Sequence, residues 1–198
     1  WDQSTNGNHA DQATDTSQPQ IYNGTAVLEF NSKPSLDFDG SMFLRTGQLT
    51  GVAQPTTRIA VSHFDTTIQT NRGYIQDGHT LRQVVGDVPI SSSKWRIYAG
   101  TVDDYHTYDP YPVINTQYLT FALFNTSSSS LAVDGTNLGT KSPGSDSFDG
   151  LTIGANAGSA SVFLDGGIQE VIVYPDNQTS NRSGIETDID NYFQIPGM

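Results

Sequence analysis

The sequence predicts an all-β protein, built as a sandwich or jelly roll of two antiparallel sheets with one short helix near its carboxyl end. Three observations predict this fold class. Short apolar or alternating segments recur along the chain, and turn residues separate them at intervals on the order of 8–12 residues. Only 15% of the residues are charged, whereas Gly, Ser, Thr and Asn are abundant. Apolar residues follow a helical spacing only near the carboxyl end.

The first half of the chain begins with a polar, turn-rich segment, residues 1–20. We expect an ordered loop there, because Trp1 is costly to leave exposed. Alternating strands follow. The predicted strands are Ala26–Phe30, Ser35–Phe38, Met42–Arg45, Thr57–Phe64, Gly73–Gln76 and His79–Val85. The last two should pair as a hairpin around Asp77-Gly78, because Asp-Gly is a strong two-residue turn signal.

The second half of the chain continues the pattern. The predicted strands are Lys94–Val102, Ile114–Phe124, Ser130–Val133, Leu151–Gly154 and Val162–Tyr174. The stretch Phe148–Tyr174 contains two apolar runs on either side of an Asn/Gly/Ser segment, which predicts two adjacent antiparallel strands. The serine run Ser127–Ser130 is expected to be a loop between long strands.

One helix is predicted near the end of the chain. Ile185, Ile189 and Tyr192–Phe193 recur at helical spacing, and Ser180 is a suitable residue to cap the helix. Gly184 should weaken its first turn by about 1 kcal/mol relative to Ala. We expect the helix to lie across one end of the sheets and to bury Ile189 and Phe193.

Charge and composition exclude several classes of function. The formal net charge is −12, from 9 basic and 21 acidic residues, which argues against nucleic-acid partners and against docking on anionic lipid. There is no cysteine, so disulfides and thiolate chemistry are excluded. No apolar run approaches the roughly 20 residues needed for membrane insertion. The chain begins at Trp1 in mid-pattern, and we expect it to be a fragment of a longer polypeptide.

Several motifs, taken in chain order, resemble the laminin-G-like branch of the concanavalin A-like lectin/glucanase superfamily. They are Pro34–Gly40, Trp95–Gly100, Ser130–Gly135, Gly150–Gly154 and Phe163–Tyr174, together with Trp1–Asn8, where Thr5 replaces the usual Gly of an early Asp-Gln-Ser-Gly-Asn-Gly-Asn loop. The resemblance implies one domain over residues 1–198, with a two-sheet jelly roll of about a dozen strands. It also implies that a concave sheet face and the loops at one rim bind glycans or proteins, often with calcium.

No catalytic residue is predicted. Glycanases of this superfamily carry closely spaced carboxylates of the Glu-x-Asp-x-Glu kind on one strand, a spacing that places acid and nucleophile on the same face. The three glutamates, Glu29, Glu170 and Glu186, stand far apart, so we expect no enzyme activity and a structural role for Glu170. His63 is likewise expected to be structural, because it stands next to Phe64 in a predicted strand.

The segment Asp103–Pro112 is the strongest candidate for ligand contact, because it combines tyrosines, aspartates and a histidine with two stiffening prolines. Tyrosine rings stack on sugars, and aspartates accept hydrogen bonds from sugar hydroxyls. The alternative is that the tyrosines fold inward as a lid on the sheet. The predicted ligand-binding residues are Asp103, Asp104, Tyr105, His106, Tyr108, Asp109 and Tyr111. Asp103, Asp104 and Asp109 are possible calcium ligands, although no EF-hand pattern is present and no cofactor is required.

Three functional hypotheses remain open at this stage. The first is a non-catalytic carbohydrate-binding or adhesion module, extracellular or on a virion surface, that binds a glycan or cell-surface receptor. The second is a structural or assembly domain of a phage virion protein, such as a tail, fibre or capsid decoration, which contacts other chains of the assembly. The third is an accessory domain of a glycanase. The first hypothesis predicts glycan binding by the isolated chain, whereas the second predicts a fixed place in a larger assembly.

Overall fold

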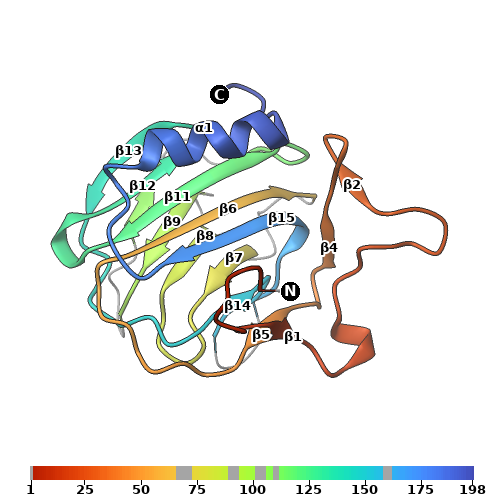
Figure 1. The fold of residues 1–198 in the computed structure, drawn as a ribbon, viewed down its shortest axis with the longest axis horizontal. Helices are drawn as coiled ribbons and strands as arrows, with labels where there is room; N and C mark the ends of the chain where they lie inside the picture. Colours follow the sequence, from red (N-terminus) through yellow and green to blue (C-terminus); the bar gives the residue numbers. More distant parts are fainter. Residues whose placement is uncertain (1, 66–72, 89–93, 101–105, 109–111, 158–161) are drawn as a thin grey trace.

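Two antiparallel sheets packed face to face make up the body of the protein. The computed structural model describes residues 2–65, 73–88, 94–100, 106–108, 112–157 and 162–198. Over these ranges it shows two large sheets, a small hairpin and one α-helix near the carboxyl end (Figure 1). This arrangement is a jelly-roll sandwich, so the predicted fold class is confirmed.

The first large sheet, called the front sheet below, is assembled from segments that are distant in the sequence. Its strands, in spatial order, are β1 (Ala10–Asp11), β5 (Leu44–Thr46), β14 (Thr152–Ile153), β7 (Gly73–Asp77), β8 (Val84–Val88), β9 (Lys94–Tyr98) and β10 (His106–Tyr108). All neighbours in this sheet pair antiparallel.

The second large sheet, the back sheet, contains the longest strands. Its spatial order is β13 (Thr136–Lys141), β12 (Ser129–Val133), β11 (Tyr118–Phe124), β6 (Thr56–Phe64), β15 (Asp165–Tyr174) and β4 (Leu36–Asp39). A separate hairpin of β2 (Glu29–Phe30) and β3 (Lys33–Pro34) stands beside it, and short 3-10 turns occur at Asp15–Ser17 and Thr126–Ser128.

The main core lies between the two sheets, because strand alternation directs one face of each sheet inward. Ile97 of β9 and Phe124 of β11 are both fully buried in it. Trp95 is 1% exposed and makes edge-to-face contacts with Phe64 and Tyr118, at centroid distances of 5.9 and 5.1 Å. Trp95 is therefore a core residue.

Helix α1 (Arg182–Phe193) covers the outer face of the back sheet (Figure 1). Ile189 and Phe193 are buried as predicted, and they pack in a second core with Ile59 and Phe121 of the sheet. Two expectations were wrong. The helix lies on a sheet face rather than across one end, because its apolar stripe needs an apolar surface to cover. The residue before the helix is Asn181, not Ser180, and its side chain makes no capping bond.

The prediction of two adjacent strands in Phe148–Tyr174 was also wrong, because β14 belongs to the front sheet and β15 to the back sheet. The chain crosses between sheets through Gly154, whose carbonyl accepts the N–H of Leu164 at 2.8 Å. Gly154 has φ +79°, and a Cβ there would lie 2.4 Å from the Phe38 ring. Only glycine fits this crossing point.

The expected hairpin around Asp77-Gly78 is replaced by a longer connection, residues 78–83, between β7 and β8. Carboxylates bind the backbone N–H groups of this connection and so compete with a tight turn. Strand β13 was not predicted, because it is largely exposed and lacks alternating apolar residues. Elsewhere strands begin later than expected: β2 begins at Glu29 and β11 at Tyr118. Within the described ranges, no helix is long and apolar enough to span a bilayer.

Candidate functional site

The segment predicted to bind ligand lies at the edge of the front sheet. Its central residues, His106–Tyr108, form β10, which pairs with β9 in the register Thr107 opposite Arg96. Part of the expected loop is thus a strand, because its backbone completes the sheet edge. The side chains of His106 and Tyr108 lie outside the described part of the structure, as do the remaining predicted site residues, Asp103, Asp104, Tyr105, Asp109 and Tyr111. Their role in binding stays a prediction.

The outer face of the front sheet carries a row of polar side chains that the described residues define. Arg45 of β5 stands opposite Thr152 of β14, which in turn stands opposite Asp77 of β7. The alternating residues Leu44 and Ile153 pack into the core between the sheets. Because successive side chains of a strand point to opposite faces, Arg45, Thr152 and Asp77 must share the outer face.

One nitrogen of the Arg45 guanidinium group, Nε, makes a hydrogen bond within the protein. Its Nε donates to the Thr152 hydroxyl at 3.1 Å, and its Cζ lies 5.3 Å from the centroid of the Phe43 ring. Its Nη2 is shielded from solvent and has no hydrogen-bond partner. Arg45 is therefore a half-buried cation that is positioned by a hydroxyl group and an aromatic ring.

Two aromatic side chains lie beside Arg45. The rings of Phe43 and Phe163 have centroids 6.3 Å apart and are tilted by 44°. Both are half-buried, whereas most other phenylalanines of the described chain are core residues. Phe163 comes from the crossing segment between β14 and β15, so the fold brings together residues that are 120 positions apart. The pair forms an apolar surface next to a guanidinium group.

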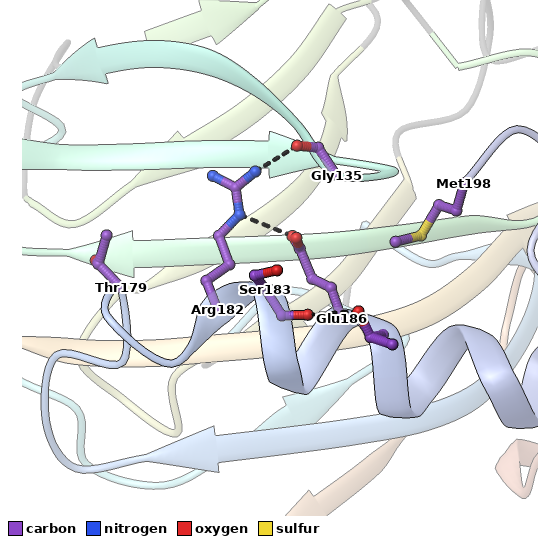
Figure 2. A pocket seen from close by; sticks show the side chains of 7 residues that line it. Gly135, Thr179, Arg182, Ser183, Glu186 and Met198 are labelled. Carbon is purple, nitrogen blue, oxygen red and sulfur yellow. Dashed lines mark hydrogen bonds and ion pairs between the residues drawn. The ribbon is translucent and has the colours of Figure 1, made fainter.

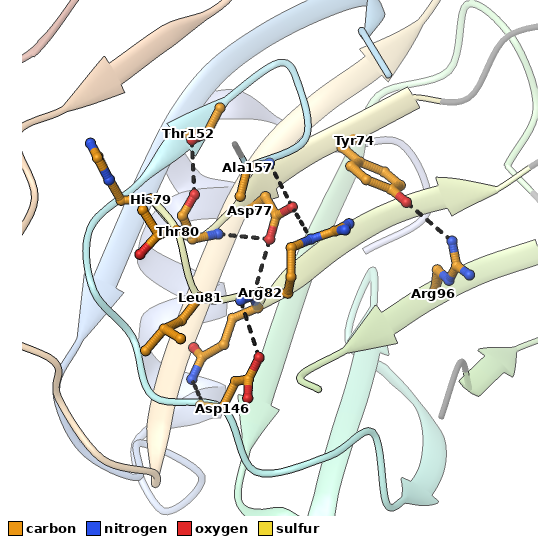
Figure 3. A network of polar contacts seen from close by, with 12 residues as sticks. Tyr74, Asp77, His79, Thr80, Leu81, Arg82, Arg96, Asp146, Thr152 and Ala157 are labelled. Carbon is orange, nitrogen blue, oxygen red and sulfur yellow. Dashed lines mark hydrogen bonds and ion pairs between the residues drawn. The ribbon is translucent and has the colours of Figure 1, made fainter. Parts of the chain in front are cut away.

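Asp77 organises the neighbouring part of the same face (Figure 3). Its carboxylate accepts the Arg82 Nε at 2.7 Å and the backbone N–H groups of Gly78, Gln83 and Ala157 at 2.8–3.1 Å. Burial raises the pKa of Asp77, and the Arg82 guanidinium and the backbone donors offset part of that rise. The carboxylate ties the 78–83 connection to the crossing segment, since Ala157 belongs to the latter.

Asp149 fixes residues 79–81 of the 78–83 connection, which lie at the end of the front sheet and are called the rim below. Its carboxylate accepts the backbone N–H groups of His79, Thr80 and Leu81, and the Thr80 hydroxyl makes a further short contact. Burial alone would raise the pKa of Asp149, but these donors hold it below its ordinary value. The rim residues 79–81 are therefore fixed by a charged acceptor rather than left as a free turn.

Arg82 extends from this connection over two tyrosine rings. Its Cζ lies 5.7 Å from the Tyr74 centroid and 5.5 Å from the Tyr98 centroid. The Tyr74 hydroxyl is also 3.3 Å from Nη1 of Arg96 (Figure 3). Burial alone would lower the pKa of Arg82, but the Asp77 carboxylate and Tyr74 raise it, so the side chain stays charged. The tyrosines are almost fully buried, which makes Arg82 the accessible member of this cluster.

A buried arginine lies beneath the two carboxylates. Arg58 of β6 is fully buried between the sheets, where Nη1 donates to the Gln83 carbonyl at 2.7 Å. Its Cζ lies 4.6 Å from the Phe148 ring centroid. Burial lowers the pKa of Arg58 to about 9, and the charges of Asp77 and Asp149 oppose that shift. Arg58 is thus a countercharge that supports the rim from inside the core.

A second polar location lies at the start of α1, where a pocket of about 450 Å³ opens (Figure 2). It is lined by Gly135, Thr179, Arg182, Ser183, Glu186, Thr187 and Met198. Arg182 is already occupied there: its Nε donates to Glu186 at 2.9 Å, and its Nη2 donates to the Gly135 carbonyl. These bonds attach the helix to the β12–β13 turn, so we assign them a structural role.

Among the described residues, no three histidine or acidic side chains are grouped so as to hold a metal ion. The expected calcium ligands, Asp103, Asp104 and Asp109, lie outside the described ranges, so that expectation is untested. Glu170 lies in β15, where burial raises the pKa of its carboxyl group.

Residues Phe43, Arg45 and Phe163 were not predicted as site residues. The pattern Met42-Phe43-Leu44-Arg45 contained a usable signal, because alternation places an aromatic ring and a cation together on the face opposite Met42 and Leu44. Met42 is indeed buried in the core. No sequence signal identified Phe163, since its position depends on the crossing between sheets.

Solved structures with this fold include two that align over most of their own length. A native heptameric SAP-like pentraxin from Limulus polyphemus is 13% identical, with a TM-score of 0.60, covering 78% of this chain and 82% of the pentraxin. Domain 4 of AbnA, an extracellular GH43 arabinanase from Geobacillus stearothermophilus in complex with arabinotriose, is 10% identical, with a TM-score of 0.57 and 80% coverage of each chain.

A sialidase from Trypanosoma rangeli, solved in complex with sialic acid, is also similar, at 12% identity and a TM-score of 0.54. The match covers 81% of this chain but only 28% of the sialidase. No protein-family model and no curated protein sequence matches the chain. At these identities the structural similarities show the jelly-roll fold alone, and they do not test the laminin-G-like branch.

Proposed function

We propose that this protein is a non-catalytic glycan-binding module that uses the outer face of the front sheet. One observation carries the proposal: Phe43, Phe163 and Arg45 lie together on the sheet face opposite the one that packs into the core. Helix α1 covers the other sheet. The two large faces of the sandwich are therefore unlike: α1 covers one, and the other carries the half-buried Phe43, Phe163 and Arg45.

The chemistry of these side chains suits a sugar. A pyranose or furanose ring presents C–H groups on its faces and hydroxyl groups around its edge. Aromatic rings such as Phe43 and Phe163 pack against the C–H faces, while a guanidinium group donates several hydrogen bonds to edge oxygens. Thr152 and Asp77 fix the surrounding groups in advance, which reduces the entropy lost on binding. The predicted segment Asp103–Tyr111 would be a separate contact, because its described residues form β10 at the sheet edge away from β5.

The similar structures support this proposal without establishing it. The AbnA domain is described in complex with arabinotriose and belongs to an extracellular arabinanase. By analogy, the present chain could serve as an accessory domain beside a glycanase, or as an adhesion module outside a cell or on a virion surface. We propose no catalytic activity, and binding at the aromatic pair requires no cofactor. Calcium bound at Asp103, Asp104 and Asp109 would form a second site, separate from the aromatic pair.

A second candidate function, assembly into a larger particle such as a phage tail or fibre, is favoured by one feature. The segment before β2 exposes three apolar side chains, Ile21 at 45%, Tyr22 at 54% and Val27 at 49%. Tyr22 and Val27 are bridge partners in an arm that extends from the sandwich (Figure 1). Apolar side chains gathered in this way often mark a protein contact.

Glycan binding can be tested with the Phe43→Ala variant. We expect the wild-type chain to bind members of a broad glycan array, and Phe43→Ala to weaken titrated binding at least tenfold, because a stacking surface is lost. Stability should change little, since Phe43 is outside the main core. Tyr192→Ala is a matched control, because Tyr192 is an exposed aromatic (55%) on α1. If the wild-type chain binds no glycan of the array, with or without calcium, the proposal is refuted.

A further inference from the structure

Arg45 is a cation without an acidic partner on the face that we propose binds glycans. Among the described residues, ion pairs are formed by Arg82 with Asp77 and by Arg182 with Glu186, and none involves Arg45. The nearest strand neighbour with a carboxylate is Asp11, its register partner on β1. Acidic residues outnumber basic residues by 21 to 9 in this chain, so an arginine without a carboxylate contact is unexpected.

The surroundings of Arg45 make its charge more effective. Its Nε donates to the Thr152 hydroxyl and its Nη2 is shielded from solvent, which leaves Nη1 as the nitrogen that a ligand can reach, and the Phe43 ring lies beside the guanidinium group. Charges that are partly withdrawn from water attract an opposite charge more strongly than exposed charges do. The N–H groups of a guanidinium nitrogen donate charge-assisted hydrogen bonds to a carboxylate or a sulfate.

We propose that the front face binds an acidic glycan, in which a sugar carboxylate or sulfate is received by the guanidinium group of Arg45. This inference rests on the proposed function and specifies its ligand class. Phe43 and Phe163 would contact the sugar ring, while Arg45 would bind its charged substituent. The net charge of −12 does not prevent this, because charges further than about 8 Å away are largely screened at physiological salt.

The test compares glycans that share a neutral core. A glycan array first ranks neutral, carboxylated and sulfated glycans. Lactose, 3′-sialyllactose and 3′-sulfated lactose are then titrated, in parallel with trigalacturonic acid and its methyl ester. We expect the strongest ligands to carry an oxyanion. Comparison of the carboxylated with the sulfated glycans shows which of the two groups Arg45 prefers. Arg45→Gln should then weaken binding of that ligand about tenfold or more, because a hydrogen bond to a charged group is lost.

Three further variants separate charge from structure. Arg45→Lys keeps the charge but loses the guanidinium group and its bond to Thr152, so its affinity should fall between wild type and Arg45→Gln. Asp11→Asn removes the nearest competing carboxylate and should strengthen binding severalfold. Arg182→Gln breaks a distant ion pair and should lower thermal stability without changing affinity.

Two results would overturn the inference in distinguishable ways. If neutral glycans bind as well as their acidic counterparts, or if Arg45→Gln binds acidic glycans like the wild type while remaining folded, the acidic specificity is wrong but glycan binding stands. If no glycan of any kind binds, the proposed function fails together with the inference. Folding of each variant is checked by its thermal unfolding midpoint.

Discussion

His63 shows at the residue scale how burial controls a titratable group. It is 4% exposed, its ring stacks on Phe30 at a centroid distance of 3.7 Å, and its Nε2 lies 3.2 Å from an oxygen of Asp65. Burial lowers the pKa of His63 to about 4, so the imidazole is neutral at pH 7 and this contact is not an ion pair. The burial agrees with the structural role that the sequence predicts.

Stability should therefore depend on His63 in acid. Between pH 6.5 and 4 the unfolded chain takes up a proton at this residue that the folded chain does not, so unfolding becomes easier as the pH falls. The loss amounts to about 3 kcal/mol at most. Urea unfolding of wild type and His63→Gln across this range measures the effect. We expect the variant to lose the acid-dependent decrease, and an unchanged pH dependence would contradict the account.

Asp134 provides a control of opposite sign. Burial raises the pKa of Asp134 from 3.8 to about 6, so the folded chain keeps a proton that the unfolded chain has lost, and stability falls as the pH rises through this window. Asp134→Asn should remove that decrease. Asn can still accept the Leu119 N–H at 2.8 Å and tolerates the positive φ of 46° at this turn.

At the scale of elements, the β2–β3 turn is joined to the end of α1. The Asn31 side-chain amide donates to the carbonyls of Phe193 and Gln194 at 3.1 and 2.9 Å, and to Gln117 at 3.0 Å. Asn31 has φ +49°, a conformation that favours Asn or Gly. One residue therefore forms the turn and also binds carbonyls at the carboxyl end of the helix.

Two substitutions separate these roles of Asn31. Asn31→Gly keeps the turn but loses the bonds to the helix end, and we expect a loss of about 1–2 kcal/mol in unfolding free energy. Asn31→Ala loses the same bonds and adds backbone strain of about 1–2 kcal/mol. Chemical denaturation measures both. Equal stability of the two variants would show that the left-handed backbone at this position carries no strain, contrary to the account.

Most elements of this fold were predictable from local patterns, while their partners were not. The continuous strand pattern in Thr57–Phe64 and the helical spacing around Ile189 gave β6 and α1 nearly to the residue. Strand pairing in a jelly roll joins distant segments, so the Phe148–Tyr174 run was wrongly assigned to one hairpin. The Asp77-Gly78 turn failed for a related reason: Asp149, 70 residues away from His79, binds the connection.

In the candidate site, too, the residues of one strand were predictable from local pattern, whereas their distant partner was not. Phe43 and Arg45 were visible as an aromatic and a cation on the outward positions of one strand, whereas Phe163 reaches them only through the crossing at Gly154. Composition directed attention to Asp103–Tyr111 instead, since it concentrates tyrosine and aspartate. Its central residues border the front sheet as β10, with four strands between them and β5, so that segment remains a separate prediction.

At the scale of the whole molecule, the two sheets have different tasks. The back sheet is covered by α1, whose Ile189 and Phe193 complete a second core. The front sheet keeps Arg45 and the Phe43–Phe163 pair on its outer face, and buried charges of Arg58 and Asp77 stabilise the adjoining rim. A rigid sandwich that holds these half-buried groups in place suits a binding module.

Chemical-shift mapping tests this division most directly. The backbone amide spectrum of the ¹⁵N-labelled chain is followed while the strongest glycan of the array is added. The account predicts that the largest shifts cluster at residues 43–46, 152–157 and 162–163 of the front face, with α1 unchanged. Shifts confined to α1 and the 134–135 turn, or to the arm around Tyr22, would contradict the claim that the front face binds glycans.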